Sequence, residues 1–249
     1  MGALIHIENM KKIYNPGENE VRALDGIDLD IEKGDLVAIV GHSGSGKSTL
    51  MNMLGCLDTP TSGKYVLDGQ DVASMTDNQL ADVRNKEIGF IFQGFNLISN
   101  LDAVGNVELP LVYRGVSKNE RKQLAMEALK SVGLEDRMKH KPNEMSGGQQ
   151  QRIAIARALC AQTKIILFDE PTSALDPETI QEVLDVMIKL AKENITMVVV
   201  THEMGFARQV ADRIVFMADG QIIEEGTPDH FFDNPSNERV KQFLGKIIR

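Results

Sequence analysis

The sequence predicts an α/β protein with a parallel sheet, because short apolar runs alternate with amphipathic helical patterns along the chain. Four of these runs are apolar throughout, as expected for strands that helices cover on both faces. A glycine-rich loop follows the first run, at the edge where parallel sheets hold ligands. The four predicted strands are Leu36–Val40, Ile88–Phe92, Ile165–Phe168 and Met197–Val200.

The composition is that of a globular protein with an acidic balance. The 249 residues are 42% hydrophobic and carry a formal net charge of −9, with a pI near 5.1. This charge argues against a sequence-independent hold on the phosphates of DNA or RNA. We find neither an export-signal pattern nor an apolar run near the roughly 18 residues of a membrane span. Two cysteines, Cys56 and Cys160, predict no disulfide framework, so we expect a cytoplasmic setting.

Three helices are predicted from capping signals and apolar spacing. Ser117–Val132 opens with Ser-Lys-Asn-Glu, which is a capping box, and ends before a glycine. Pro177–Lys192 has Asp176 as its predicted N-cap and a proline in its first turn. A last amphipathic helix is predicted over Val240, Phe243, Leu244, Ile247 and Ile248.

The loop after the first strand fits the phosphate-binding pattern G-x-x-x-x-G-K-[ST], and a predicted helix, Thr49–Leu54, follows it. Glycines let the backbone turn its N–H groups toward a phosphate, and the helix N-terminus adds a positive dipole end. Lys47 is expected to reach the β- and γ-phosphates and Ser48 to ligate Mg²⁺. The alternative is a strand–helix turn that binds nothing. The candidate binding residues are Gly41, His42, Ser43, Gly44, Ser45, Gly46, Lys47, Ser48 and Thr49.

This loop alone leaves kinases, GTPases and ATPases open. The guanine-reading pattern Asn-Lys-x-Asp is absent, because the nearest match, Asn85-Lys86-Glu87-Ile88, fails it. A second candidate site lies at the end of the strand Ile165–Phe168, where Asp169 and Glu170 follow. We expect Asp169 to hold Mg²⁺ and Glu170 to act as a general base on the attacking water. The alternative is a solvated strand end.

A third motif is Met145-Ser146-Gly147-Gly148-Gln149-Gln150-Gln151-Arg152. Ser146 and Gln149 have capping-box spacing, and the two glycines leave the first N–H groups uncovered, as in helix starts that bind anions. The spacing by itself is equally consistent with a well-capped helix.

With these motifs in order, the chain resembles the nucleotide-binding domain of ATP-binding-cassette (ABC) ATPases. Ser146, Gly147, Gly148 and Gln149 match the family's signature motif, with Met145 where leucine is commoner. The resemblance implies four further roles. It matches Tyr14 to the residue that stacks on adenine, Gln93 to the glutamine that contacts Mg²⁺ and the attacking water, Ser173–Asp176 to the dimer-contact loop, and His202 to the histidine that touches the γ-phosphate.

The resemblance implies a P-loop NTPase (RecA-like) parallel-sheet core with an antiparallel β subdomain and an inserted α-helical subdomain. We expect a single cassette over 1–249, with the catalytic core in 1–93 and 162–249 and the helical signature subdomain in 94–161. The cofactors implied are ATP and Mg²⁺.

The resemblance also implies partners. Two copies are expected to pair head to tail as an ATP-dependent homodimer, each ATP lying between one cradle and the other copy's signature helix. Separate transmembrane permease subunits are expected to bind near 94–107, which places the chain on the inner face of the cell membrane without inserting into it. Neither a nucleic-acid partner nor direct membrane insertion is expected.

The subfamily indications conflict. Up to about residue 160 the chain resembles ATPases of lipoprotein-release and macrolide-export systems, and from 161 to 249 it resembles polar amino-acid importer ATPases. One hypothesis is therefore a chimera joined near Leu159–Gln162. Three function classes stay open: a transporter ATPase, a soluble ABC ATPase with a non-transport partner, and an engineered hybrid that binds nucleotide without coupling.

Overall fold

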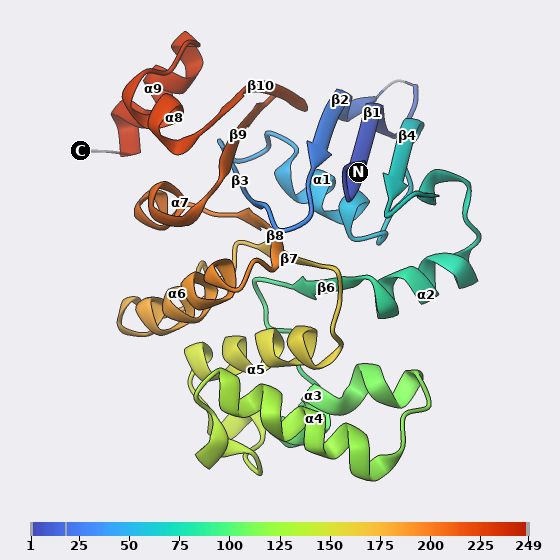
Figure 1. Ribbon diagram of the computed structural model, residues 1–249. Coiled ribbons are helices and arrows are strands. Elements are labelled where there is room, and N and C mark those ends of the chain that lie inside the picture. Colours follow the sequence, from blue (N-terminus) through green and yellow to red (C-terminus); the bar gives the residue numbers. More distant parts are fainter. Residues whose placement is uncertain (1, 18, 248–249) are drawn as a thin grey trace. The chain divides into compact units, whose positions relative to one another are not determined.

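The computed structural model describes residues 2–17 and 19–247, and the chain divides into two compact units. The first combines Met1–Leu80 with Asn194–Arg249, and the second is Ala81–Glu193. Figure 1 shows the elements of both. The helical subdomain predicted over 94–161 lies entirely within the second unit, and its limits stay a prediction.

The first unit contains an antiparallel sheet with the strand order β2-β1-β4-β5. The pairing of β1 with β2 contains several register shifts, the first between Ile7 and Met10. Because these shifts interrupt the alternation of buried and exposed side chains, β1 lacks the regular period of a half-buried strand. Its strands are β1 (Ile5–Tyr14), β2 (Val21–Ile31), β4 (Ser62–Leu67) and β5 (Gln70–Asp71).

Four strands of the same unit form a second sheet in the order β10-β9-β3-β8. The central strand, β3, is buried along its whole length and runs parallel to β8 and β9. The bounds are β3 (Leu36–Gly41), β8 (Thr196–Val200), β9 (Arg213–Ala218) and β10 (Gln221–Gly226). The two strands predicted here are confirmed to within one residue, because continuous burial requires continuous apolar sequence.

The helices of the first unit lie between its strands, or after the last strand, along the chain. The phosphate-loop helix begins at Lys47, two residues before its predicted start, and the C-terminal helix begins at Glu238. Ile248, the last residue of that predicted helix, lies outside the described residues. The helices are α1 (Lys47–Leu54), α7 (Met204–Val210), α8 (Pro228–Asp233), α9 (Glu238–Ile247) and the short η1 (Val72–Ser74), while α2 (Asp77–Lys86) spans the boundary between the units.

The second unit pairs two parallel strands with a group of helices. Helices α3, α4 and α5 pack on one another, and α5 also contacts β6 and α6. The elements are β6 (Ile88–Ile91), α3 (Ala103–Tyr113), α4 (Lys118–Ser131), η2 (Glu135–Arg137), η3 (Pro142–Glu144), α5 (Gly147–Cys160), β7 (Ile165–Asp169) and α6 (Pro177–Lys192).

Helix ends in this unit follow the predicted capping in part. Ser117 caps α4 and accepts from the Glu120 N–H at 3.4 Å, but the reciprocal bond of the predicted capping box is not found among the described residues. Asp176 stands at the N-cap position of α6, but its side chain makes no capping hydrogen bond. Because the Asp176 carboxylate is exposed and makes no capping hydrogen bond, it is accessible to another group.

Among the described residues, no helix combines the length and the apolar character needed to cross a membrane.

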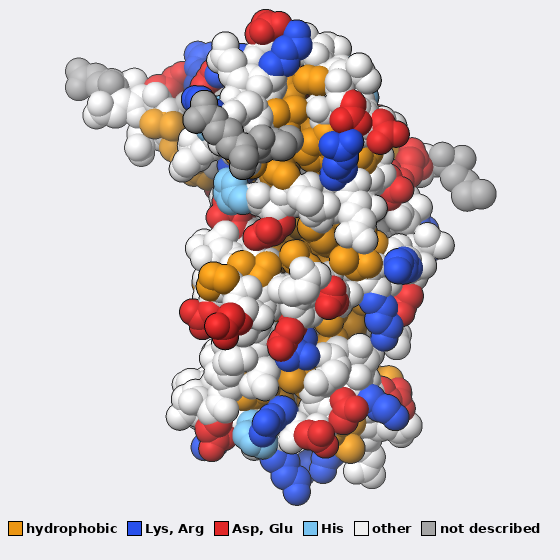
Figure 2. Space-filling model, turned by 90° about the vertical axis from the view of Figure 1, so that its left-hand side faces the viewer, with side chains coloured by type: hydrophobic (Ala, Val, Ile, Leu, Met, Phe, Trp, Pro, Cys, Tyr) orange, Lys and Arg blue, Asp and Glu red, His pale blue; other side chains and the backbone are white. Residues whose placement is uncertain are grey.

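Figure 2 shows one face of the molecule, on which acidic and basic side chains are interspersed.

Candidate functional site

The phosphate-loop residues 41–48 follow β3 directly and enter α1 in the first unit. Gly41, Gly44 and Gly46 have positive φ angles of 152°, 77° and 100°. At Gly46 a Cβ atom would lie only 2.4 Å from the Ala23 carbonyl oxygen, so the loop path requires glycine there. The backbone of this loop can therefore take its path only because glycines have no side chains. Such a path lets backbone N–H groups point toward a common centre.

Lys47 folds back across this loop. Its side chain is buried, and Nζ donates to the Gly41 carbonyl at 3.0 Å and to the His42 carbonyl at 2.9 Å. The ammonium group is thus held over the loop by the backbone that precedes it. Ser45 Oγ is also buried, and no hydrogen bond to it is found within the described part of the chain. A buried cation, an orphan hydroxyl and the glycine path together fit a bound phosphate chain.

His42 packs within the first unit. Its ring meets the Phe243 ring edge-on at 5.2 Å and the Phe216 ring at 6.4 Å. These contacts join the second residue of the loop to β9 and α9. The side chain of His42 therefore supports the loop by packing, whereas its backbone belongs to the cradle.

Tyr14, at the end of β1, is held by two charged neighbours. Its hydroxyl donates to Asp58 Oδ2 at 3.0 Å, and Lys12 Nζ lies 4.9 Å from the centre of its ring. Lys12 also donates to Asp58 Oδ1 at 2.7 Å. Burial by itself would raise the pKa of Asp58, but hydrogen bonds from Lys12, the Thr59 N–H and Tyr14 lower that pKa below its usual value. The Tyr14 ring, about a third exposed, is thereby fixed in orientation.

His202 lies immediately beyond β8 in the same unit and is exposed. The preceding residue, Thr201, is buried and accepts from the Glu203 N–H through Oγ1 at 2.9 Å. This bond closes a tight turn between β8 and α7, so the backbone at His202 is fixed while its ring stays accessible.

In the second unit, Asp169 ends β7 and Glu170 follows it in a left-handed conformation with φ of 48°. Glu170 Oε2 accepts from Ser173 Oγ at 3.0 Å, and its carbonyl accepts from the Ser173 N–H at 3.2 Å. A non-glycine residue in this region of φ is strained and persists because its surroundings fix it. Both acids are half-buried.

Gln93 follows β6, also in the second unit, and is exposed. Two residues just beyond it, Phe95 and Asn96, have positive φ angles of 61° and 50°. The segment after Gln93 is therefore a second strained turn, next to a strand end that the sequence predicted as functional.

The signature residues form the predicted helix start. Gln149 N–H donates to Ser146 Oγ at 3.3 Å and Ser146 N–H donates to Gln149 Oε1 at 3.1 Å, which is a complete capping box. At Gly148 a Cβ atom would lie 2.9 Å from the Thr179 Cβ atom of α6. The glycine thus brings the signature helix against the first turn of α6, the helix that Asp176 begins.

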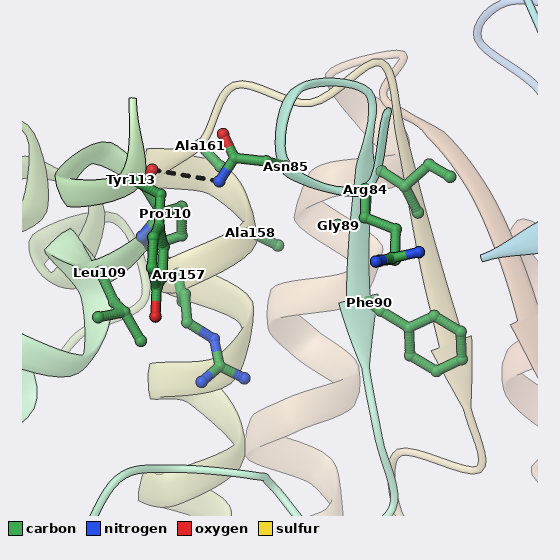
Figure 3. A pocket seen from close by; sticks show the side chains of 11 residues that line it. Arg84, Asn85, Gly89, Phe90, Leu109, Pro110, Tyr113, Arg157, Ala158 and Ala161 are labelled. Carbon is green, nitrogen blue, oxygen red and sulfur yellow. Dashed lines mark hydrogen bonds between the residues drawn. The ribbon is translucent and has the colours of Figure 1, made fainter. Parts of the chain in front are cut away.

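A cavity of about 270 Å³ lies in the second unit (Figure 3). Leu109, Pro110 and Tyr113 of α3 line one side, and Arg84 and Phe90 lie on the other. The lining is largely apolar and includes the basic side chains of Arg84 and Arg157. Tyr113, one of the lining residues, is 77% exposed. Two of the lining residues are joined by Arg114, whose side chain donates to Asn85 Oδ1 at 2.9 Å and to the Ala161 carbonyl at 2.7 Å.

Two polar residues of α5, the buried Gln151 and the half-buried Arg157, were not predicted from the sequence. Gln151 is fully buried and donates to backbone carbonyls beside Gln93 and Glu170. Its only sequence signal is a polar residue among the buried positions of the helix, which does not reveal the partner.

A family model described as ABC transporter matches residues 24–173, which is more than half of the chain. The chain belongs to this family. The ABC transporter ATP-binding protein YknY of Bacillus subtilis, an uncharacterized relative, is 52% identical over 220 residues, 88% of this chain and 95% of that protein. The glutamine transport ATP-binding protein GlnQ of Geobacillus stearothermophilus is 49% identical over 248 residues, 98% of this chain and 99% of that protein.

Solved structures agree with the family and the fold. The dimeric structure of a post-hydrolysis state of the ATP-binding cassette MJ0796, bound to ADP and Pi, matches with a TM-score of 0.82 and 44% identity. The match covers 90% of this chain and 98% of that one. The predicted fold class is confirmed: a P-loop fold with a parallel core sheet, an antiparallel subdomain and a helical subdomain.

The chain is therefore an ABC-type ATPase that binds nucleotide and, as the ATP-binding subunit, energises an ABC transporter. The chimera hypothesis is not supported. Matches of 220 and 248 residues both extend across 159–162, so each of these natural relatives aligns through the supposed join.

Proposed function

We propose that this chain powers the import of a polar amino acid. The observation that carries the proposal is the match to the glutamine transport protein, which extends over 248 residues. That match covers 98% of this chain and 99% of the relative. A relative that aligns over nearly its whole length at 49% identity supports the same class of transported substrate.

For the chemistry, we propose that the cradle 41–49 binds the phosphates of ATP and that Tyr14 stacks on the adenine. Lys47 neutralises charge on the β- and γ-phosphates. Ser48, Gln93 and Asp169 are the residues that we assign to hold Mg²⁺, which would neutralise the charge that develops on the phosphates.

Hydrolysis is assigned to three residues. Glu170 accepts a proton from the attacking water, and the bond from Ser173 Oγ orients its carboxylate. Gln93 orients the same water, and His202 contacts the γ-phosphate. In this proposal Ser146, Gly147, Gly148, Gln149 and Asp176 act across a head-to-tail homodimer, on the partner's nucleotide.

In this proposal, association of the two copies depends on which nucleotide is bound. The γ-phosphate joins the cradle of one copy to the signature helix of the other, so ATP favours closure and hydrolysis favours opening. With a charge of −9 on each copy, repulsion opposes association in the absence of ligand.

We further propose that separate membrane subunits dock on the second unit, over the segment 94–107 and the cavity beside α3, and hold the chain at the cytoplasmic membrane face. Ile98 is 40% exposed and Tyr113 77% exposed, which leaves apolar surface for a partner.

Replacing Tyr113 with glutamate tests this surface. We expect the ATPase rate of the purified protein to stay within about twofold, because exposed substitutions away from a site change stability little. Transport in cells should fall strongly, because a charge would be buried against an apolar partner. Met126→Glu on α4, at a side chain 40% exposed, is the matched control and should transport normally. Equal transport by both variants would contradict the docking surface.

Uptake measurements test the substrate class. Cells that lack the gene are expected to lose uptake of labelled glutamine or glutamate, and the wild-type gene should restore it. A gene encoding Lys47→Ala should not. If uptake is unchanged while export of a hydrophobic compound fails, the export-type alternative indicated by the first part of the sequence replaces the import proposal.

A further inference from the structure

Gln151 lies on the signature helix α5 and is 0% exposed. Its Nε2 donates to the Pro171 carbonyl at 2.8 Å and to the Phe92 carbonyl at 3.2 Å. Pro171 directly follows Glu170, and Phe92 directly precedes Gln93. One side-chain amide therefore contacts the backbone next to both residues assigned to water activation, from the helix that carries the signature motif.

The carbonyl oxygen of the same side-chain amide lacks a hydrogen-bond donor among the described residues. Gln151 Oε1 is buried, and the described residues offer it no hydrogen bond. A buried acceptor without a partner lowers stability, and an apolar side chain of the same size would avoid that cost. The two donor hydrogens are therefore the feature of Gln151 that an apolar residue cannot replace.

The segment that Gln151 holds is strained. Glu170 has a φ of 48°, and the carbonyl that accepts the shorter amide bond belongs to the next residue. A non-glycine residue keeps such a conformation only where neighbouring contacts fix it. The bond to Pro171 thus fixes the backbone that aims the Glu170 carboxylate.

The same helix holds the second strained turn. Arg157 Nη1 donates to the Asn96 carbonyl at 2.8 Å and Nη2 to the Phe95 carbonyl at 3.4 Å, and both of those residues have positive φ. Arg157 and Gln151 thereby attach α5 to the backbone on either side of Gln93.

We propose that Gln151 is a positioning residue for hydrolysis, whose amide makes the signature helix, Gln93 and Glu170 move as one body. This inference rests on the proposed roles of those residues. Because the signature helix is assigned to the partner's nucleotide, and Gln93 and Glu170 to the chain's own, Gln151 would link the two ATP sites of a dimer.

The test uses Gln151→Met, which keeps the length and volume of the side chain and removes both donors. We expect kcat for ATP to fall about 10- to 100-fold, as for a small misplacement of a reacting group. KM should change by less than about twofold and Tm by less than about 3 °C, because one orphan acceptor is also removed. The matched control is Gln150→Met, whose half-buried amide donates to the Met145 carbonyl at 3.1 Å and should leave kcat unchanged.

A second variant and a second readout keep the test decisive. Gln151→Asn keeps the amide but is one methylene too short, so it should lose kcat like the methionine variant. Amide hydrogen exchange should quicken in 93–97 and 172–175 of Gln151→Met and stay unchanged in 204–210, which belong to the other unit. Unchanged kcat in both variants, or a joint loss of kcat, ATP affinity and Tm, would overturn the proposal.

Amide hydrogen exchange also distinguishes failure of this inference from failure of the proposed function. If Glu170→Gln hydrolyses ATP normally, the assigned role of Glu170 fails. Faster exchange in 172–175 of Gln151→Met would then still show that the amide holds this segment, whereas unchanged exchange there would overturn the inference by itself.

Discussion

Glu170→Gln is expected to lower ATP turnover about 10²- to 10⁴-fold, the usual contribution of a positioned general base. The substitution keeps the size and hydrogen-bonding capacity of the side chain, so Ser173 Oγ retains an acceptor at this position. What it removes is the carboxylate that takes a proton from water. ATP binding should therefore persist, and steady-state phosphate release is the measurement.

The same variant is expected to accumulate as a dimer when ATP is present, because the γ-phosphate that joins the two copies is not removed. Size-exclusion chromatography with and without ATP checks this. Glu178→Gln, an exposed acid in the first turn of α6, is the control for loss of one negative charge and should behave like the wild type. Wild-type turnover by Glu170→Gln would remove Glu170 from the catalytic role.

Lys47→Ala is expected to weaken ATP binding about 10- to 100-fold, since a charge-assisted hydrogen bond contributes roughly 1.5–3 kcal/mol. The loss has two sources in the structure. The ammonium group that would meet the phosphates disappears, and the Gly41 and His42 carbonyls lose the donor that holds the loop.

Isothermal titration calorimetry with ATP gives the affinity directly. Lys64→Ala removes an exposed lysine from β4 of the same unit and should bind ATP like the wild type. Thermal unfolding of both variants establishes that the first unit is folded. An unchanged ATP affinity in Lys47→Ala would contradict the cradle assignment.

The strands that the sequence predicts are buried ones, although β9, which is buried from Ile214 to Ala218, was not among them. The four predicted strands are buried along nearly their whole lengths, so continuous apolar runs identified β3, β6, β7 and β8. The antiparallel strands went unassigned individually, because register shifts in β1 break the period that a half-buried strand shows. Helix α6 matched its predicted range because its first turn contains a proline and its apolar positions keep helical spacing.

Within the candidate site, the sequence identified the groups whose chemistry requires a local pattern. Glycines at 41, 44 and 46 indicate a backbone path that other residues do not readily adopt. Ser146 with Gln149 indicates a capped helix start. Gln151 and Arg157 have no such pattern. Their partners are backbone carbonyls that lie 20 to 62 residues away in the chain. Every residue has a backbone carbonyl, so the sequence does not indicate which ones these side chains contact.

The sequence by itself thus determined the fold class, the glycine-rich loop after β3, the capped helix start at Ser146 and the acids at the end of β7, because the patterns that indicate them lie among neighbours a few residues apart. The tertiary structure decided what fixes those groups: the carbonyls that hold Lys47, the acid that holds Tyr14, and the α5 side chains that fasten the turns beside Gln93 and Glu170. The physical reason is that a hydrogen bond depends on where donor and acceptor meet in space, and long-range packing sets that meeting point.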